Sequence, residues 1–383
     1  VKSVNVMEEN LQELNKLGIK VPMILGGAAL QRSYCENHLR STYHGKTYHG
    51  TDAFEGLRLM DYITANRFEE LDAEIEQRNE KRAVKEEKVA ELVARAEEGT
   101  AASVAVLPAR SDTAVLDTVP PPPFWGDRVV DHVPLDHIYP YVNETALFKT
   151  QWQFVRGDKK SADYERQLED EVRPIFDRYK RDMRDQNVLQ GKVVYGFWPC
   201  NADGDDLIVY DPQDHDREIE RFTNFPRQGE RKRLCISDFF LPAESGKKDV
   251  LPMQCVTMGQ EISHVAKRYF DANDYTEYLY AHGMGVECAE ALAELWHKRI
   301  RAELGVGNDD SPKIKQLFTQ KYRGSRYSFG YPSCPEMQDQ EILFRLLKPE
   351  RIGCELTENW QIDPEQSTSA IVVHHPDAKY FNV

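Results

Sequence analysis

Residues 99–124 restrict the fold of this chain more than any other part of its sequence. They are rich in alanine, serine, threonine and proline, and they include four consecutive prolines at positions 120–123. Because proline has a fixed φ and no amide hydrogen, such a segment favours an extended polyproline conformation over a packed core. The 383 residues are enough for two domains, each with a core of its own. We therefore predict one domain on each side of this segment.

The first domain, over residues 1–65, alternates between helix and strand patterns. Apolar residues recur every three or four positions over 4–17, which predicts an amphipathic helix. The apolar run 21–25 predicts a buried strand, and Gly26 and Gly27 predict a turn into the next helix. A second strand pattern and a second helix pattern follow at 46–51 and 52–63. This alternation predicts a partial doubly wound, Rossmann-like α/β domain.

Residues 66–98 carry charges of both signs between sparse apolar positions. This composition predicts a long, solvated helix that acts as a spacer. Together with the proline-rich segment it forms a predicted linker over 66–122.

The remaining residues, 123–383, predict an α+β domain with an antiparallel sheet. The segment 191–198 and the alternating segment 205–210 flank a turn at Asp203 and Gly204, as in a β-hairpin. Helix patterns flank these strands at 161–186, with Pro174 near a kink or start, and at 273–304. A last strand pattern covers 368–375. Its final residues, His374 and His375, should point in opposite directions, so we expect one buried and one exposed histidine and no shared metal.

The composition excludes several classes of function. The formal net charge of −15 disfavours nucleic-acid binding, and no apolar run is long enough for a membrane span. Seven scattered cysteines without a Cys-x-x-Cys pair predict reduced thiols in a cytoplasmic protein. No catalytic triad, Walker loop or zinc-ligand spacing is present. The first residues lack an initiator Met and a signal peptide, so we expect the chain to be cut from a longer protein.

The segment RGSRYSFGYPSCP, residues 323–335, has the composition of a rigid binding loop. Gly330 permits unusual backbone geometry, and two prolines restrict the loop around Tyr331. Arg326 suits bidentate binding of a carboxylate, and Tyr331 offers a flat face and a hydroxyl to a purine or ribose. The alternative is a surface arginine beside a core tyrosine.

Glu290 lies in the middle of an apolar helical segment, CAEALAELWHKRI. A carboxylate in such surroundings needs a partner. A cationic ligand is one candidate, and Glu294, His297 or a neighbouring arginine is another.

Six segments together resemble cobalamin-dependent methionine synthase, in the order that the family has them. They cover essentially the whole chain: VPMILGGAAL, TDAFEGLRLM, VPPPPFWG, GKVVYGFWPCNADGDDLIVY, KYRGSRYSFGYPSCPE and HHPDAKY. The resemblance implies the end of a cobalamin-binding domain joined to an S-adenosylmethionine-binding activation domain.

For the cobalamin domain, the resemblance implies that Gly26, Gly27 and Ala53 line the pocket for the nucleotide tail of the cofactor. The family's cobalt-ligating histidine lies in an Asp-x-His-x-x-Gly motif, which this sequence does not contain. We expect that histidine upstream of Val1.

For the activation domain, the resemblance implies that Arg326, Tyr331 and Glu290 bind S-adenosylmethionine. The family's tyrosine pair falls on Tyr380 and Phe381, which keeps an aromatic edge and loses one hydroxyl.

At two further positions this chain differs from the family pattern. A family aspartate falls on Asn143 and a family glutamate on Gln320. Each change keeps hydrogen bonding and removes a negative charge beside a cationic ligand. We expect each loss to weaken binding by roughly 1–3 kcal/mol if the site is buried and no other acid compensates.

The resemblance also implies a reaction and its partners. The full enzyme transfers a methyl group from methyltetrahydrofolate to homocysteine through methylcobalamin, with a zinc-bound homocysteine in an upstream domain. This region binds S-adenosylmethionine for the reductive methylation of cob(II)alamin, with an electron from flavodoxin or a flavoprotein reductase. We expect no catalytic acid, base or nucleophile in this region, and no turnover by it alone.

Two other functions stay open. One is a stand-alone corrinoid reactivation or S-adenosylmethionine-sensing protein. The other is a non-enzymatic interaction module that recruits a partner through its charged helix and proline-rich linker, with the Gly-Tyr-Pro loop serving only structure.

Overall fold

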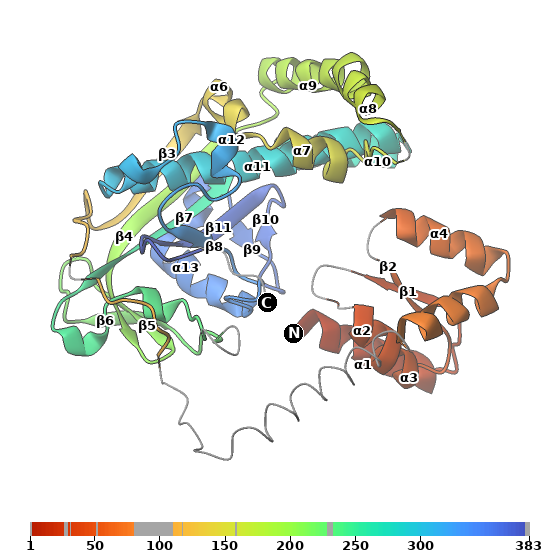
Figure 1. The fold of residues 1–383 in the computed structure, drawn as a ribbon, viewed down its shortest axis with the longest axis horizontal. Helices are drawn as coiled ribbons and strands as arrows, with labels where there is room; N and C mark the ends of the chain where they lie inside the picture. The colour runs from red at the N-terminus through yellow and green to blue at the C-terminus, as the bar shows by residue number, and fades with distance from the viewer. Residues whose placement is uncertain are drawn as a thin grey trace. The chain divides into compact units, whose positions relative to one another are not determined.

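The computed structural model describes residues 2–26, 30, 32–50, 53–79, 110–116, 118–157, 159–227 and 233–379. Its contacts divide the chain into two compact units, Val1–Leu107 and Pro108–Val383. Figure 1 shows the elements of each unit.

The first unit pairs two short strands in parallel, as the alternating pattern predicts. Strand β1 lies beside β2 with Met23 opposite Thr47 and Gly26 opposite Gly50. The unit contains, in order, α1 (Lys2–Lys16), β1 (Met23–Gly26), α2 (Arg32–Tyr34), a π turn (Cys35–Leu39), α3 (Arg40–Thr42), β2 (Thr47–Gly50) and α4 (Ala53–Thr64). The complete doubly wound fold stays a prediction.

Residues 68–79 form a helix that packs on the rest of the first unit. Leu71 and Ile75 are buried in one cluster with Tyr48 and Leu59. Their spacing of four residues places both on one helix face. For this part of 66–98, the prediction of a solvated spacer is wrong, because two of its few apolar residues are enough to bury one face.

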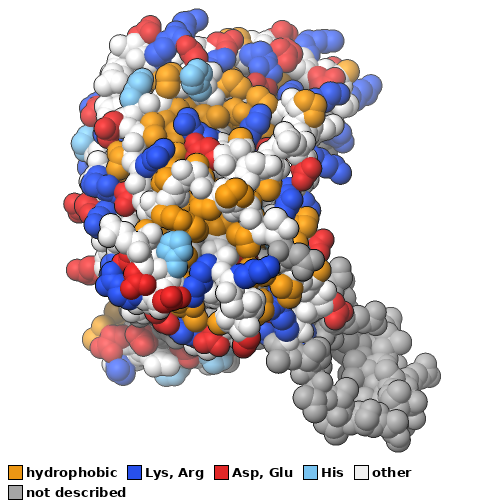
Figure 2. All heavy atoms as spheres, turned by 90° about the vertical axis from the view of Figure 1, so that its left-hand side faces the viewer, with side chains coloured by type: hydrophobic (Ala, Val, Ile, Leu, Met, Phe, Trp, Pro, Cys, Tyr) orange, Lys and Arg blue, Asp and Glu red, His pale blue; other side chains and the backbone are white. Residues whose placement is uncertain are grey.

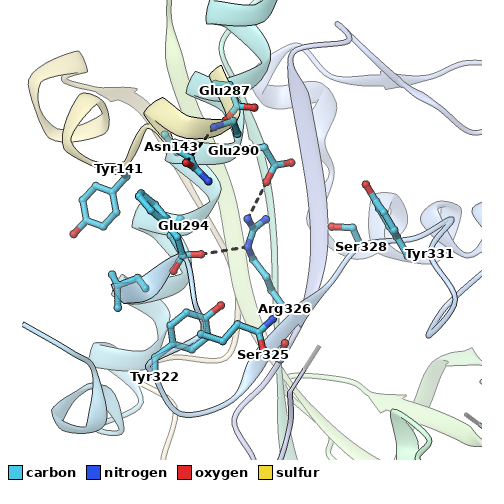
Figure 3. Close-up of a pocket in the computed structure, with 15 residues that line it drawn as sticks. Tyr141, Asn143, Glu287, Glu290, Glu294, Tyr322, Ser325, Arg326, Ser328 and Tyr331 are labelled. Carbon is cyan, nitrogen blue, oxygen red and sulfur yellow. Dashed lines mark hydrogen bonds and ion pairs between the residues drawn. The ribbon is translucent and has the colours of Figure 1, made fainter. Parts of the chain in front are cut away.

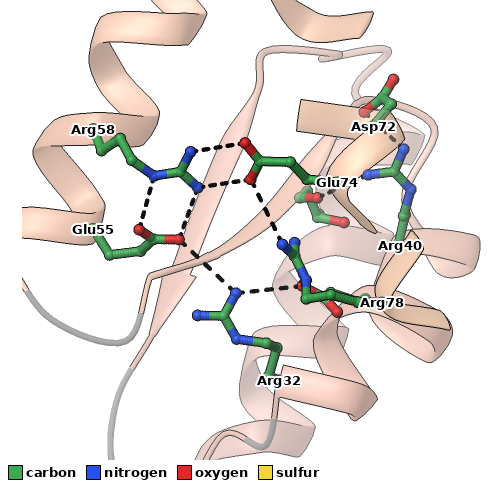
Figure 4. Close-up of polar contacts among 9 residues, drawn as sticks. Arg32, Arg40, Glu55, Arg58, Asp72, Glu74 and Arg78 are labelled. Carbon is green, nitrogen blue, oxygen red and sulfur yellow. Dashed lines mark hydrogen bonds and ion pairs between the residues drawn. The ribbon is translucent and has the colours of Figure 1, made fainter. Parts of the chain in front are cut away.

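Ion pairs also bind this helix to the rest of the unit (Figure 4). Arg58 on α4 contacts Glu74 at 3.0 Å and Glu55 at 2.9 Å. Arg78 contacts the buried Glu36 at 2.9 Å. The helix is therefore held by apolar contacts on one side and by charged contacts on another.

The second unit is built on a large antiparallel sheet. Among the described residues its strand order is β6-β5-β4-β7-β11-β8, and β3 pairs with β4. The strands are β3 (Gly126–Val133), β4 (Gly191–Asp203), β5 (Asp206–Tyr210), β6 (Glu218–Phe222), β7 (Asp249–Thr257), β8 (Ser325–Tyr327) and β11 (Ser367–Val373). A separate short hairpin joins β9 (Glu355–Leu356) and β10 (Ile362–Asp363). The predicted antiparallel sheet and the hairpin around Gly204 are confirmed.

Helices cover both faces of this sheet (Figure 1). On β4, Val193 and Phe197 belong to the core that contains α11, and Val194 and Trp198 to the core that contains α13. The helices are α6 (Leu135–Ile138), α7 (Glu144–Ala146), α8 (Ser161–Gln167), α9 (Arg173–Asp185), α10 (Glu261–Asp271), α11 (Tyr275–Glu303), α12 (Ile314–Leu317) and α13 (Gln340–Leu347), with π turns at Leu147–Gln151 and Leu168–Val172. The predicted helices at 161–186 and 273–304 are confirmed, and Pro174 lies in the first turn of α9.

Both adjacent histidines after β11 are buried, each with 1% of its surface exposed. His374 Nε2 lies 2.7 Å from Asp249 Oδ1, and His375 Nε2 lies 2.9 Å from the carbonyl oxygen of Ala114. The prediction of one exposed histidine is wrong, because residues 110–116 pack on the rest of the second unit, and Ala114 contacts His375 there. Ser111 N donates to Asp238 Oδ2 at 2.9 Å and holds this segment in place.

All seven cysteines are free thiols and buried. None of the described helices is long and apolar enough to cross a membrane. The described His, Cys, Asp and Glu residues form no group of three or more that could hold a metal ion. On the face shown in Figure 2, charges of both signs are interspersed, and the described residues form no continuous basic surface there.

Candidate functional site

Strand β8 at the edge of the sheet positions Arg326. In the register with β11, Arg326 lies opposite Val372, which belongs to the core under α11. Side chains of paired residues share a face, so Arg326 points toward α11. Gly324, just before β8, has φ +84°, and a Cβ there would lie 2.2 Å from the carbonyl oxygen of Val373. The close approach of β8 to β11 therefore requires glycine at this position.

Helix α11 carries three glutamates near this arginine. Glu287, Glu290 and Glu294 are spaced by three and four residues, so they form one stripe on the helix. Arg326 Nη2 donates to Glu290 Oε2 at 2.8 Å, and its Nε lies 3.7 Å from Glu294 Oε2. Figure 3 shows the guanidinium between these two carboxylates.

These residues line a cavity of about 420 Å³ between α11, β8 and the loops around them. Its volume is within the range of small-molecule pockets. The wall consists of Tyr141, Asn143, Ala146, Glu287, Glu290, Ala291, Glu294, Leu317, Phe318, Gln320, Tyr322, Ser325, Arg326, Ser328 and Tyr331. The cavity is therefore concave, mixed in polarity and rich in charged groups.

The charges in the wall favour a cationic ligand. The described lining residues include three carboxylates and one guanidinium. Burial raises the pKa of Glu294, although Arg326 and Arg301 act in the opposite direction. Burial also raises the pKa of Glu287 to about 7, opposed by a hydrogen bond from Gln151 and reinforced by the charge of Glu290. A cation in the cavity would stabilise both carboxylates in their ionised form.

The charge of Arg326 is secure despite its burial. Desolvation lowers the pKa of its guanidinium, but Glu290 and Glu294 outweigh that effect and hold the pKa above its ordinary value. Arg326 is thus a permanent cation in the wall, able to bind a carboxylate.

Tyr322 forms a rigid base for the cavity. The guanidinium carbon of Arg301 lies 4.1 Å from the centre of its ring, and the ring of His297 meets it edge-on at 5.1 Å. Arg301 in turn makes two hydrogen bonds to Asp310, of 2.9 and 2.8 Å, in a buried ion pair. This packing holds the buried tyrosine ring in the cavity wall.

Tyr331 lies at the mouth of the cavity, with 53% of its surface exposed. Gly330 has φ +88°, which confirms the predicted unusual geometry. Gly330 N donates to the carbonyl of Cys334 at 2.9 Å, and Cys334 N donates to the carbonyl of Tyr331 at 2.9 Å. The loop is closed on itself, and it presents the aromatic ring outward.

Residues 134–383 match the protein family described as "Vitamin B12 dependent methionine synthase, activation domain". The chain belongs to this family. It is 43% identical over 408 residues to methionine synthase of Mycobacterium tuberculosis (strain ATCC 25618 / H37Rv), covering 100% of this chain and 34% of that protein. It is 41% identical over 409 residues to methionine synthase of Mycobacterium leprae (strain TN), with the same coverage. The chain thus spans about a third of the length of these relatives.

A solved structure in the same family has a similar fold. The crystal structure of the MetH reactivation domain bound to AdoHcy matches with a TM-score of 0.62 and 26% sequence identity. The match covers 69% of this chain and 83% of that one. The antiparallel sheet with its helices is therefore the fold of a reactivation domain.

The structure brings together five of the predicted site residues. They all line the same cavity: Asn143, Glu290, Gln320, Arg326 and Tyr331. Asn143 Oδ1 also accepts a hydrogen bond from Ala146 N at 3.3 Å, which caps α7. Glu290 forms an ion pair with Arg326. A neighbouring arginine was one of the partners that its position in the helix left open. The predicted Tyr380 and Phe381 lie outside the described residues.

The predicted cobalamin residues lie in the other unit. Gly26 ends β1 opposite Gly50, and a Cβ on Gly26 would lie 2.6 Å from the carbonyl oxygen of Gly50. The close approach of the two strands therefore explains glycine at this position. Gly27 and the side chain of Ala53 lie outside the described part of the chain.

Sequence reasoning did not assign Glu287 or Glu294 to the site. The signal was present, because glutamates at three- and four-residue spacing in an apolar helix must share one face. Tyr322 was missed as well, since only the tertiary packing of His297 and Arg301 shows where its ring lies.

Proposed function

We propose that the cavity around Arg326 binds S-adenosylmethionine and that the chain is the reactivation region of a methionine synthase. The observation that carries this proposal is the position of Arg326 between glutamates of α11. S-adenosylmethionine has one carboxylate, one ammonium and one sulfonium. An arginine among three carboxylates complements that pattern of charge.

The solved relative supports the same ligand class. That reactivation domain is bound to AdoHcy, which differs from S-adenosylmethionine by the transferred methyl group. The aromatic groups of the cavity wall, Tyr322 and Tyr331, offer flat faces for the adenine of such a ligand. Tyr380 and Phe381 are proposed to complete the site.

In the whole enzyme, we propose methyl transfer from 5-methyltetrahydrofolate to homocysteine through cobalamin. This region serves the reductive methylation of cob(II)alamin, with flavodoxin or a flavoprotein reductase as the electron donor. A sulfonium is already a good leaving group, so the chain's own residues bind and orient the ligand and exclude water. No acid, base or nucleophile of this chain is required.

For cobalamin, the residues of the first unit are compatible with a contact to the cofactor. Gly26 and Gly50 end the two parallel strands without side chains. Ligands of parallel α/β sheets lie at the carboxyl ends of the strands. We propose that Gly26, Gly27 and Ala53 line the pocket for the nucleotide tail, and that the cobalt ligand comes from another part of the enzyme.

The function is tested in the full-length enzyme with the substitution Arg326→Ala. We expect recovery from cob(II)alamin with S-adenosylmethionine and a reductase to be lost, and primary turnover with methyltetrahydrofolate to stay nearly unchanged. A variant that reactivates normally, or one that loses primary turnover to the same extent, would contradict the proposal.

A further inference from the structure

Glu287 differs from the other two glutamates of the cavity in its surroundings. Arg326 contacts Glu290 and approaches Glu294, whereas Glu287 forms no ion pair with any described cation. Its hydrogen-bond partner is the side-chain amide of Gln151, at a long 3.4 Å. Only 7% of the surface of Glu287 is exposed.

A carboxylate in this position is costly in the unliganded chain. Removing an ionised carboxylate from water costs several kcal/mol unless a cation or several hydrogen bonds replace the water, and one long amide bond does not. Burial raises the pKa of Glu287 to about 7, so the group is poised between its two forms near neutral pH. Perturbed carboxyls in cavities are typical of functional sites.

We propose that Glu287 binds the ammonium group of the amino-acid part of the ligand. This inference rests on the proposed function of the cavity. In an amino acid the ammonium and the carboxylate are attached to the same carbon, so their partners must lie close together. Arg326 provides the cation for the carboxylate, and Glu287 is one helical turn from Glu290, which Arg326 contacts.

Among the described groups around it, Glu287 is best suited to bind the ammonium. Asn143 lies at the same end of the cavity (Figure 3), but its amide carries no charge, and its oxygen caps α7. Glu290 and Glu294 share the charge of Arg326. Glu287 is therefore the lining carboxylate whose charge the described residues do not already balance.

The test compares two ligands that differ by one amino group. The full 383-residue chain is titrated by calorimetry with S-adenosylhomocysteine and with its deaminated analogue, for the native protein and for Glu287→Gln. We expect the native chain to prefer the amino form roughly 10- to 100-fold, as for a hydrogen bond to a charged group, and Glu287→Gln to lose most of that preference. Glu303→Gln makes the same charge change on α11 outside the cavity wall, and it should keep the preference.

The outcomes separate the two proposals. If the native chain binds neither ligand, the proposed function is wrong. If the native chain prefers the amino form and Glu287→Gln keeps that preference, the function stands and the role of Glu287 is wrong.

A second measurement uses only the native chain, so it does not depend on the folding of a variant. Gln151 on the facing π turn and Glu290 on the same helix are the described groups that most affect the ionisation of Glu287. Binding of an ammonium should ionise Glu287, so titration at neutral pH in two buffers of different ionisation enthalpy should detect proton release with S-adenosylhomocysteine. Equal proton release with the deaminated analogue would overturn the inference.

Discussion

Arg326 of the edge strand β8 donates a 2.8 Å hydrogen bond to Glu290 in the middle of α11. The pair joins the edge strand of the sheet to α11, and both residues line the cavity. Glu290 is 48% exposed at its side chain, so the pair adds little to stability. Its main effect is to hold the guanidinium in a defined place.

Glu290→Gln should therefore affect binding more than folding. We expect the free energy of unfolding to change by less than about 1 kcal/mol, as for an exposed ion pair. Affinity for S-adenosylmethionine should fall about tenfold or more, because a charged contact beside the ligand is lost. Chemical denaturation and calorimetric titration measure the two effects, and a large loss of stability with unchanged affinity would contradict this role.

Gly324→Ala should disturb both the fold and the site. A left-handed backbone with a Cβ costs roughly 1–2 kcal/mol, and here the Cβ would also meet the carbonyl oxygen of Val373 at 2.2 Å. Gly353→Ala is the matched control, since Gly353 has φ +83° and open space around it. We expect Gly324→Ala to cost at least about 2 kcal/mol more than Gly353→Ala, as overpacking does, and to weaken ligand binding. Equal losses of stability in thermal unfolding would show that β8 does not depend on this close approach.

Glu287→Gln should stabilise the unliganded chain at high pH. The pKa of Glu287 is about 7 in the folded chain and 4.5 ordinarily. Between these values the folded state binds more protons than the unfolded state, so stability falls as pH rises from about 4.5 to above 7. The variant should thus be more stable than the native chain by on the order of 3 kcal/mol at pH 8, and equal to it near pH 4. A difference that does not depend on pH, in denaturation at both values, would argue against a buried titrating carboxyl.

Asn143→Asp should increase affinity for S-adenosylmethionine. Aspartate caps a helix about as well as asparagine, so α7 should keep its cap and the unfolding temperature should stay nearly constant. The added negative charge beside the ammonium should raise affinity by roughly three- to tenfold. Asn187→Asp, outside the cavity wall, controls for net charge. Unchanged affinity in both variants would mean that another acid already compensates, with Glu287 as the first candidate.

Much of the second unit was predictable, because its signals are local. The segment 191–198 and the alternating segment 205–210 predict β4 and β5, and the spacing in 273–304 predicts α11. Arg326 and Tyr331 were found because glycine and proline mark a rigid loop around them.

What could not be predicted depends on contacts distant in sequence. His375 is buried because Ala114, far away in the chain, accepts its hydrogen bond. The burial of Leu71 and Ile75 depends on the packing of a whole unit, and their charged neighbours conceal it in the sequence. The role proposed for Glu287 could not be inferred from the sequence, because it depends on the ion pairs of Arg326 with the other two glutamates.

The most direct test of the central claim is calorimetric titration of the 383-residue chain with S-adenosylmethionine. Arg326→Ala is compared with Arg345→Ala, a control whose arginine pairs with Glu220 away from the cavity. We predict saturable binding at one site in the native chain and in Arg345→Ala, and a loss of at least about 100-fold in Arg326→Ala. A folded native chain that does not bind, or an Arg326→Ala variant that binds as the native chain does, would contradict the account.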